Sequence, residues 1–162
     1  MPDIREQKTA FLERIQEYNH KYELSKIVGP DYYEPGMMEN LGQYCGVSDD
    51  QSNYTIRVDV KGLRYENRSA RLKKCKVGDE LKIIRDAQNS YNANNFNVAL
   101  SDGFIMGTLP ANLCNAIASL YDLGYLVIEK VFISYIEQLN ERSRYAKQGV
   151  MFVELHVHLR GL

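Results

Sequence analysis

The middle of the chain reads KGLRY (residues 61–65), KVGDEL (76–81), RDAQNSYNANN (85–95) and GTLP (107–110). Apolar runs in this stretch end in polar turns that carry arginine, tyrosine and asparagine. Such side chains can hydrogen-bond phosphate groups and stack on nucleic-acid bases. The 162 residues contain no set of catalytic residues as distinct as these binding residues, so the sequence favours a binding role for the turns.

Alternating apolar residues around these motifs predict six β-strands, because a period of two is typical of a half-buried strand. The strands are expected near residues 54–61, 81–84, 96–100, 104–109, 125–135 and 151–159. Pro110 is expected to open a helix over 111–121, with Leu113, Ile117 and Leu120 on its inner face, and Gly124 to end it.

This order of elements predicts a mainly β (α+β) fold. Six strands with one helix between the fourth and fifth suggest a small OB-like barrel, closed or nearly closed. A plain two-layer α+β sheet is the alternative.

The chain is expected to have three parts. Residues 1–28 form an amphipathic helix, since Phe11, Leu12, Ile15, Tyr18 and Tyr22 recur at helical spacing. Residues 29–53 are rich in turn formers and predict an irregular connector, and residues 54–162 form the barrel domain. The apolar stripe of the helix is expected to pack on its own domain or on a partner subunit.

Charge is distributed unevenly along the chain. Residues 1–53 carry five Lys/Arg and ten Asp/Glu, whereas residues 54–162 carry fifteen and eleven. Within 61–76 there are seven basic residues and one acidic residue, and such a run attracts polyanions. A solvent-exposed hairpin loop is the alternative interpretation of that run. The acidic residues 1–53 could instead pack on the basic half of a neighbour and form a homo-oligomer.

The cysteines and the apolar runs predict a cytoplasmic protein without membrane contact. The chain has three cysteines, Cys45, Cys75 and Cys114, which lie far apart and form no CxxC pair. An odd number of widely spaced cysteines is typical of free thiols in a reducing compartment. No signal peptide or membrane-spanning run is visible, and no motif predicts a bound cofactor.

Two histidines on the last predicted strand are the one candidate for metal chemistry. His156 and His158 lie two residues apart, so both side chains point to one face of the strand. Two histidines on a solvated face are usually not ligands, and no nucleophile elbow, P-loop or carboxylate cluster is present. We therefore predict no catalytic or metal-ligating residue. A metal-dependent hydrolase acting on nucleic acid or an acid anhydride is the third hypothesis.

The polar loop 85–95 is the strongest positive signal. Arg85 is expected to leave its strand beside Asp86, which could hold it. Many of the surrounding asparagines are expected to hydrogen-bond their own backbone and fix the loop. Tyr91 is either a plug into the core or a platform for a base.

These motifs resemble the HIRAN domain over about residues 55–135. That family has a Gly-x-Arg-Tyr-Tyr step, a Val-Gly-Asp strand entry, an Arg-(Asp/Glu)-Pro-x-Asn-Pro-Tyr-Asp-x-Asn-Ala loop and a Gly-x-(Leu/Ile)-Pro step before its helix. The chain has GLRYE at 62–66, VGD at 77–79, RDAQNSYNANN at 85–95 and GTLP at 107–110. Glu66 replaces the second tyrosine, and Asn92 replaces the loop aspartate.

The resemblance implies a modified OB fold that binds DNA, found fused to Swi/Snf-type helicases and nucleases and as a free-standing bacterial protein. The expected function is a non-catalytic nucleic-acid-binding module for single-stranded DNA or DNA 3′ ends. Arg64 would contact phosphate, and Tyr65 and Tyr91 would stack on bases. The full set of implied site residues is Arg64, Tyr65, Arg85, Asn89, Tyr91, Asn92 and Thr108.

Overall fold

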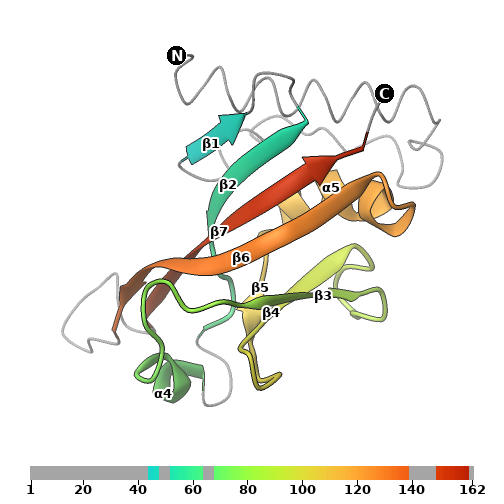
Figure 1. Cartoon of the computed structure of the whole chain (residues 1–162). Coiled ribbons are helices and arrows are strands. Elements are labelled where there is room, and N and C mark those ends of the chain that lie inside the picture. The colour runs from blue at the N-terminus through green and yellow to red at the C-terminus, as the bar shows by residue number, and fades with distance from the viewer. Residues whose placement is uncertain (1–43, 48–51, 64–67, 139–148, 161–162) are drawn as a thin grey trace.

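The computed structural model describes residues 44–47, 52–63, 68–138 and 149–160 (Figure 1). These ranges form seven strands and two helices in the following order: β1 (Tyr44–Val47), β2 (Asn53–Asp59), α4 (Arg68–Leu72), β3 (Lys82–Asp86), β4 (Asn95–Ala99), β5 (Ile105–Thr108), α5 (Ala111–Asp122), β6 (Leu126–Glu137) and β7 (Val150–Leu159). The helix expected over 1–28 lies outside the described residues.

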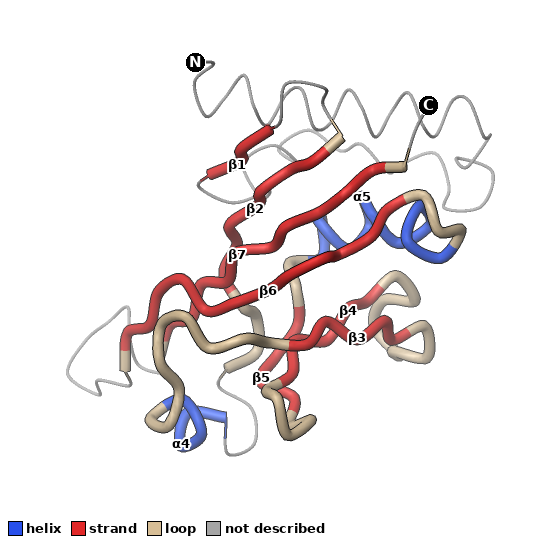
Figure 2. Tube along the Cα trace, viewed as in Figure 1, coloured by secondary structure: helices blue, strands red, loops and turns tan. Residues whose placement is uncertain are grey.

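The strands form two antiparallel sheets. The larger sheet has the order β1-β2-β7-β6, and the smaller sheet has the order β3-β4-β5. Figure 2 shows the larger sheet above the smaller one, with α5 behind the larger sheet and α4 at the lower left. The protein is thus mainly β, and α5 connects β5 to β6 as predicted.

The six predicted strands are present as β2 to β7, but they do not form a closed barrel. Narrow bridges join the two sheets instead: Lys61 exchanges two backbone hydrogen bonds with Thr108 (N···O 2.9 Å each), and Glu80 pairs with Phe132. Strands β3 to β5 are only four or five residues long. The segment just before β3 bonds to β6 over a short stretch, through Gly78 N–H to the Ile133 carbonyl (2.7 Å) and Leu81 N–H to the Val131 carbonyl (3.0 Å).

Beyond the Glu80–Phe132 bridge the two sheets diverge. A groove of about 470 Å³ opens there between β3 and β6, lined among others by Ile83, Tyr121 and Ile128. The prediction of a closed barrel was therefore wrong, although the six predicted strands are present.

The core lies between the sheets and α5. Strands β2 and β7 alternate buried and half-exposed residues throughout, as their period of two predicts. The helix buries Leu113, Ile117 and Leu120, each at most 1% exposed, which confirms the inner face expected from the sequence. Burial of this stripe fixes α5 against the strands that position the candidate site.

Two described elements were not expected. Strand β1 lies inside the range predicted to be an irregular connector (29–53) and pairs with β2. Helix α4 lies in the basic run and is anchored by Leu72, which is fully buried. A helix of five residues is too short to leave a periodic pattern in the sequence. Neither α4 nor α5, the helices of the described ranges, combines the length and apolarity needed to cross a bilayer.

Candidate nucleic-acid interface

The loop between β3 and β4 is fixed by its own asparagine side chains. The Asn89 side-chain oxygen accepts the backbone N–H groups of Tyr91 (2.9 Å) and Asn92 (3.0 Å). Asn92 repeats the motif by accepting the N–H of Asn94 (3.0 Å). Because these bonds hold the loop without help from the tyrosine, the Tyr91 ring is left 97% exposed. Of the two roles considered for Tyr91, the plug into the core is excluded by this exposure.

The same loop is attached to α5. Asn92 and Asn94 each donate a side-chain N–H to the side-chain oxygen of Asn115, at 3.1 and 3.2 Å. Asn115 lies one turn into the helix and is half-buried, between the buried residues Cys114 and Ala116. Sequence reasoning missed Asn115, although its place in the ANLCNAIASL run was a usable signal.

Arg85 is bound on every nitrogen of its guanidinium group. Nε and Nη2 contact the two carboxylate oxygens of Asp122 at 2.9 and 3.1 Å, and Nη1 donates to the carbonyls of Ala93 (2.7 Å) and Asn95 (3.1 Å). The guanidinium also lies 5.3 Å from the centre of the Phe96 ring. The side chain is 16% exposed. Arg85 therefore joins the loop to the last residue of α5.

The expectation that Asp86 holds Arg85 was wrong. Neighbouring residues of a strand point to opposite faces, so the two side chains do not meet. Asp86 instead accepts side-chain N–H groups at 3.3–3.5 Å from the three asparagines Asn89, Asn95 and Asn97. This second cluster closes the base of the loop from its other side.

Thr108 lies at the junction between the sheets and α5. Its backbone exchanges the two hydrogen bonds with Lys61, and Pro110, two residues later, occupies the N-cap position of α5. No side-chain hydrogen bond from the described residues caps this helix, and the N-terminus of a helix favours an anion. The close approach explains Gly107, since a Cβ there would meet the Lys61 carbonyl oxygen and lie 2.6 Å from Val60 Cγ1.

Arg64 and Tyr65 lie outside the described residues, but the chain on both sides of them is fixed. Leu63 is 3% exposed, and the Arg68 Nη1 donates to the Gly62 carbonyl at 2.8 Å. Gly62 follows directly on the Lys61–Thr108 bridge. The described ends of this segment therefore lie beside the strand that leads into α5.

The structure thus gathers part of the predicted set around one helix. Thr108 precedes the first turn of α5, and Asn92, Asn89 and Tyr91 belong to the loop held at Asn115. Arg85 lies at the other end of the helix, at Asp122.

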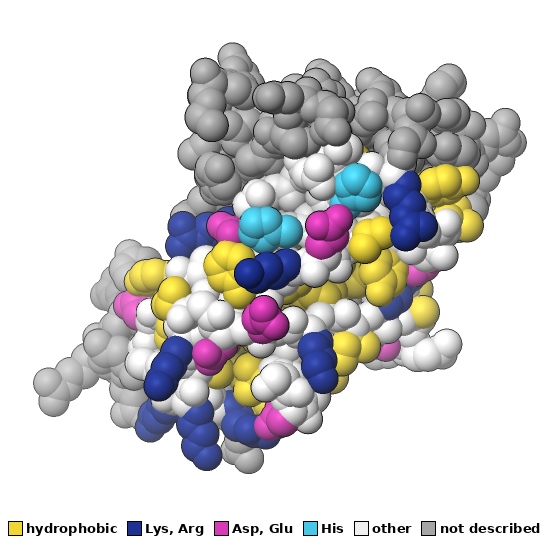
Figure 3. Space-filling view, in the orientation of Figure 1, with side chains coloured by type: hydrophobic (Ala, Val, Ile, Leu, Met, Phe, Trp, Pro, Cys, Tyr) yellow, Lys and Arg dark blue, Asp and Glu magenta, His cyan; other side chains and the backbone are white. Residues whose placement is uncertain are grey.

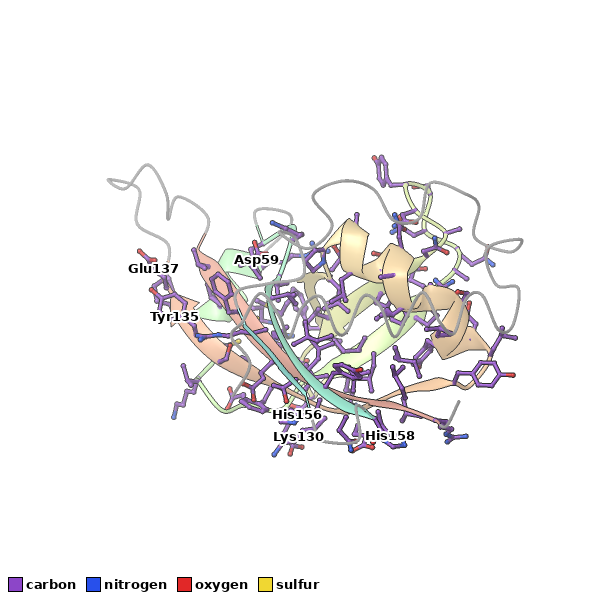
Figure 4. The ribbon with its side chains drawn as sticks, turned by 90° about the horizontal axis from the view of Figure 1, so that it is seen from above. Asp59, Lys130, Tyr135, Glu137, His156 and His158 are labelled. Carbon is purple, nitrogen blue, oxygen red and sulfur yellow. The ribbon has the colours of Figure 1, made fainter. Side chains whose placement is uncertain are left out.

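His156 and His158 lie on one face of β7, as the strand pattern predicted (Figure 4). His156 Nε2 lies 2.9 Å from a Glu154 carboxylate oxygen, and His158 Nδ1 lies 2.9 Å from the Asn53 side-chain oxygen. Phe132 stacks on the His156 ring at 5.8 Å. Across the described ranges no three His, Cys, Asp or Glu side chains form a group that could hold a metal ion. The geometry gives the hydrolase hypothesis no site there.

These features define a small two-sheet β domain in which a rigid, tyrosine-bearing loop lies against a single helix. The family model of the HIRAN domain matches residues 53–150, about three-fifths of the chain. The protein belongs to the HIRAN domain family. Since HIRAN domains are DNA-binding modules, this membership supports a nucleic-acid-binding role.

The same fold is seen in a solved HIRAN domain. The crystal structure of the HIRAN domain of human HLTF is 20% identical with a TM-score of 0.50, over 65% of this chain and 77% of that chain. A protein from Lactobacillus plantarum is also 20% identical, with a TM-score of 0.47 over 65% of this chain and 98% of that chain. No curated protein matches the sequence.

Proposed function

We propose that the protein is a non-catalytic module that binds single-stranded DNA, including its 3′ end. The observation that carries this proposal is Tyr91, whose ring is 97% exposed on a loop fixed by side-chain hydrogen bonds. Removal of a solvent-exposed aromatic ring does not lower the stability of the fold. The exposed ring offers a flat face on which a base can stack. Fixing the loop beforehand reduces the entropy lost on binding.

The neighbouring groups have complementary roles in this proposal. Asn89 and Asn92 hold the loop in the conformation that presents Tyr91, and Arg85 holds the loop against α5 through Asp122. The uncapped N-terminus of α5 beside Thr108 supplies N–H groups for a phosphate. Following the family resemblance, Arg64 contacts a phosphate and Tyr65 stacks on a second base.

Fluorescence anisotropy with labelled single-stranded oligonucleotides of about 12 nucleotides tests the proposal. Because a base stacked on an aromatic ring contributes about 1–3 kcal/mol, Tyr91→Ala is expected to weaken binding roughly 5- to 150-fold. Tyr91→Phe keeps the ring and is expected to bind as the wild type does. Arg64→Ala is expected to weaken binding and to lower the slope of log K against log salt by about 1.

Tyr135→Ala is the matched control, since it removes another exposed tyrosine (40%) from β6 (Figure 4). Oligonucleotides with free and blocked 3′ ends measure the preference for an end. Absence of binding by the wild type, or binding that neither Tyr91→Ala nor Arg64→Ala weakens, would reject the proposal.

The alternative, a homo-oligomer formed through residues 1–53, concerns a segment of which the described residues include only 44–47 and 52–53. Static light scattering of the full chain tests it directly. A mass of 18.7 kDa at micromolar concentration would exclude it.

A further inference from the structure

Three lysines form an exposed basic cluster directly after α4. Lys73, Lys74 and Lys76, here called the lysine cluster, are all exposed and make no ion pair with any described residue. Figure 3 shows Lys and Arg side chains gathered at the lower left, where Figure 1 places α4.

The backbone that carries the lysine cluster is anchored in the core. Leu72 is fully buried and Cys75 is 9% exposed, so the two buried residues flank Lys73 and Lys74. The N–H groups of Lys74 and Cys75 donate to the carbonyls of Arg71 and Leu72 at 3.0 Å each, and the Lys76 N–H donates to the Asp79 carboxylate at 2.9 Å. The lysine side chains therefore project from a defined turn.

The two arginines of α4 have partners among the described residues, whereas the three lysines form no ion pair there. Arg68 donates to the Gly62 carbonyl, and Arg71 forms an ion pair with Asp102 at 3.0 Å while lying 4.3 Å from the centre of the Phe104 ring. Among the described residues of this region, the positive charge without an ion-pair partner therefore resides on lysine. A lysine ammonium on a flexible stem suits a phosphate contact that needs no fixed geometry.

We propose that the lysine cluster is a second contact site, one that binds the sugar–phosphate backbone of the strand whose end occupies the candidate interface. This inference rests on the proposed function. Helix α4 starts at Arg68, which holds Gly62 next to the Lys61–Thr108 bridge, and its five residues span about 8 Å. A strand that extends from the α5 N-terminus over Gly62 therefore meets the lysine cluster after a short distance.

Such a contact has a recognisable signature. Residues 73–77 contain no aromatic side chain, so the cluster binds phosphate without reading bases. Its contribution is expected to be independent of sequence, to fall with salt, and to appear only when the oligonucleotide is long enough to reach it.

The test compares two triple variants on short (about 4 nucleotides) and long (about 16 nucleotides) single strands. Lys73→Ala/Lys74→Ala/Lys76→Ala is expected to weaken binding of the long strand about 10-fold at low salt and to lower its salt slope by about 2. Binding of the short strand is expected to stay within about 2-fold, because a strand that ends at the interface does not reach the cluster. The control Lys82→Ala/Lys130→Ala/Arg160→Ala removes the same charge from exposed positions on β3, β6 and the chain after β7.

The outcomes separate the two proposals. Two results would overturn the proposal for the lysine cluster alone, provided that the wild type binds through Tyr91. One is an equal effect of both triple variants, and the other is a lysine-cluster variant that binds the long strand as tightly as the wild type. A wild type that binds neither strand would overturn the proposed function together with this inference. Circular dichroism of each variant establishes that it is folded.

Discussion

Replacing Arg85 distinguishes a residue that holds the loop from one that touches DNA. Arg85→Ala removes the paired contacts to Asp122, the hydrogen bonds to the carbonyls of Ala93 and Asn95, and the contact with the Phe96 ring. All of these contacts connect the β3–β4 loop to its surroundings, so their loss is expected to loosen the loop that presents Tyr91.

The loss of stability expected for Arg85→Ala follows from the solvent exposure of Arg85 and its partners. Asp122 is 47% exposed, so the ion pair is screened by water and contributes at most about 1 kcal/mol. The two carbonyl hydrogen bonds involve a charged donor that is 16% exposed, and together they contribute about 1–2 kcal/mol more. Arg85→Ala is therefore expected to cost about 2–3 kcal/mol, a fall in Tm of roughly 4–12 °C for a chain of this length.

Urea unfolding followed by circular dichroism measures this cost, since the chain contains no tryptophan. Lys82→Ala removes an exposed cation from the same strand and is expected to change stability by less than about 0.5 kcal/mol. The Asp122→Asn variant tests whether Arg85 acts in DNA binding by holding the loop or by touching DNA. If Arg85 holds the loop, releasing it from Asp122 weakens DNA binding even though a negative charge is lost. Tighter DNA binding by Asp122→Asn, or an Arg85→Ala variant as stable as the wild type, would refute the reasoning.

Three further substitutions test other contacts. Gly107→Ala is expected to destabilise the fold by about 2–3 kcal/mol, measured as the urea midpoint, because the new Cβ would overlap the Lys61 carbonyl and Val60 at the bridge between the sheets. Burial raises the pKa of the Cys114 thiol from 9.0 to about 11, so the folded state holds this proton more tightly than the unfolded state. Stability is expected to fall as pH rises from 9 to 11, and urea midpoints of Cys114→Ala over that range should lack this part of the decline. Asn92→Asp is expected to loosen the loop and to weaken binding of free and blocked 3′ ends alike, measured by anisotropy; a gain specific to free ends would contradict this.

The strands and α5 were predictable because their burial repeats. Each inward residue of β2 and β7 is separated from the next by one outward residue over seven and ten positions, and a pattern of that length identifies both the element and its face. Among the α4 residues whose burial the structure describes, Leu72 alone is buried, so the run of charges obscured this helix. Closure of the barrel depends on where strand pairing stops, which side-chain periodicity does not encode.

The candidate site was predictable in its residue types but not in its pairings. The asparagines of loop 86–95 were expected to fix the loop, and their side chains do accept backbone N–H groups. The partners Asp122 and Asn115 come from a helix more than twenty positions away in sequence. Sequence distance favoured Asp86 for Arg85, whereas the alternation of side chains along β3 separates those two neighbours.

The pairing of Asn92 with Asn115 changes what the loop can offer to a ligand. The family resemblance places an aspartate at this position, where it would accept a hydrogen bond from a 3′-hydroxyl. Asn92 instead donates to the side-chain oxygen of Asn115 at 3.1 Å, and a carboxylate has no N–H group with which to do so. An aspartate there would also place a negative charge against that oxygen, so Asn92 and Asn115 form a matched amide pair. In the proposed binding mode this loop contributes stacking on Tyr91, and any preference for a free 3′ end arises from groups other than a carboxylate at position 92.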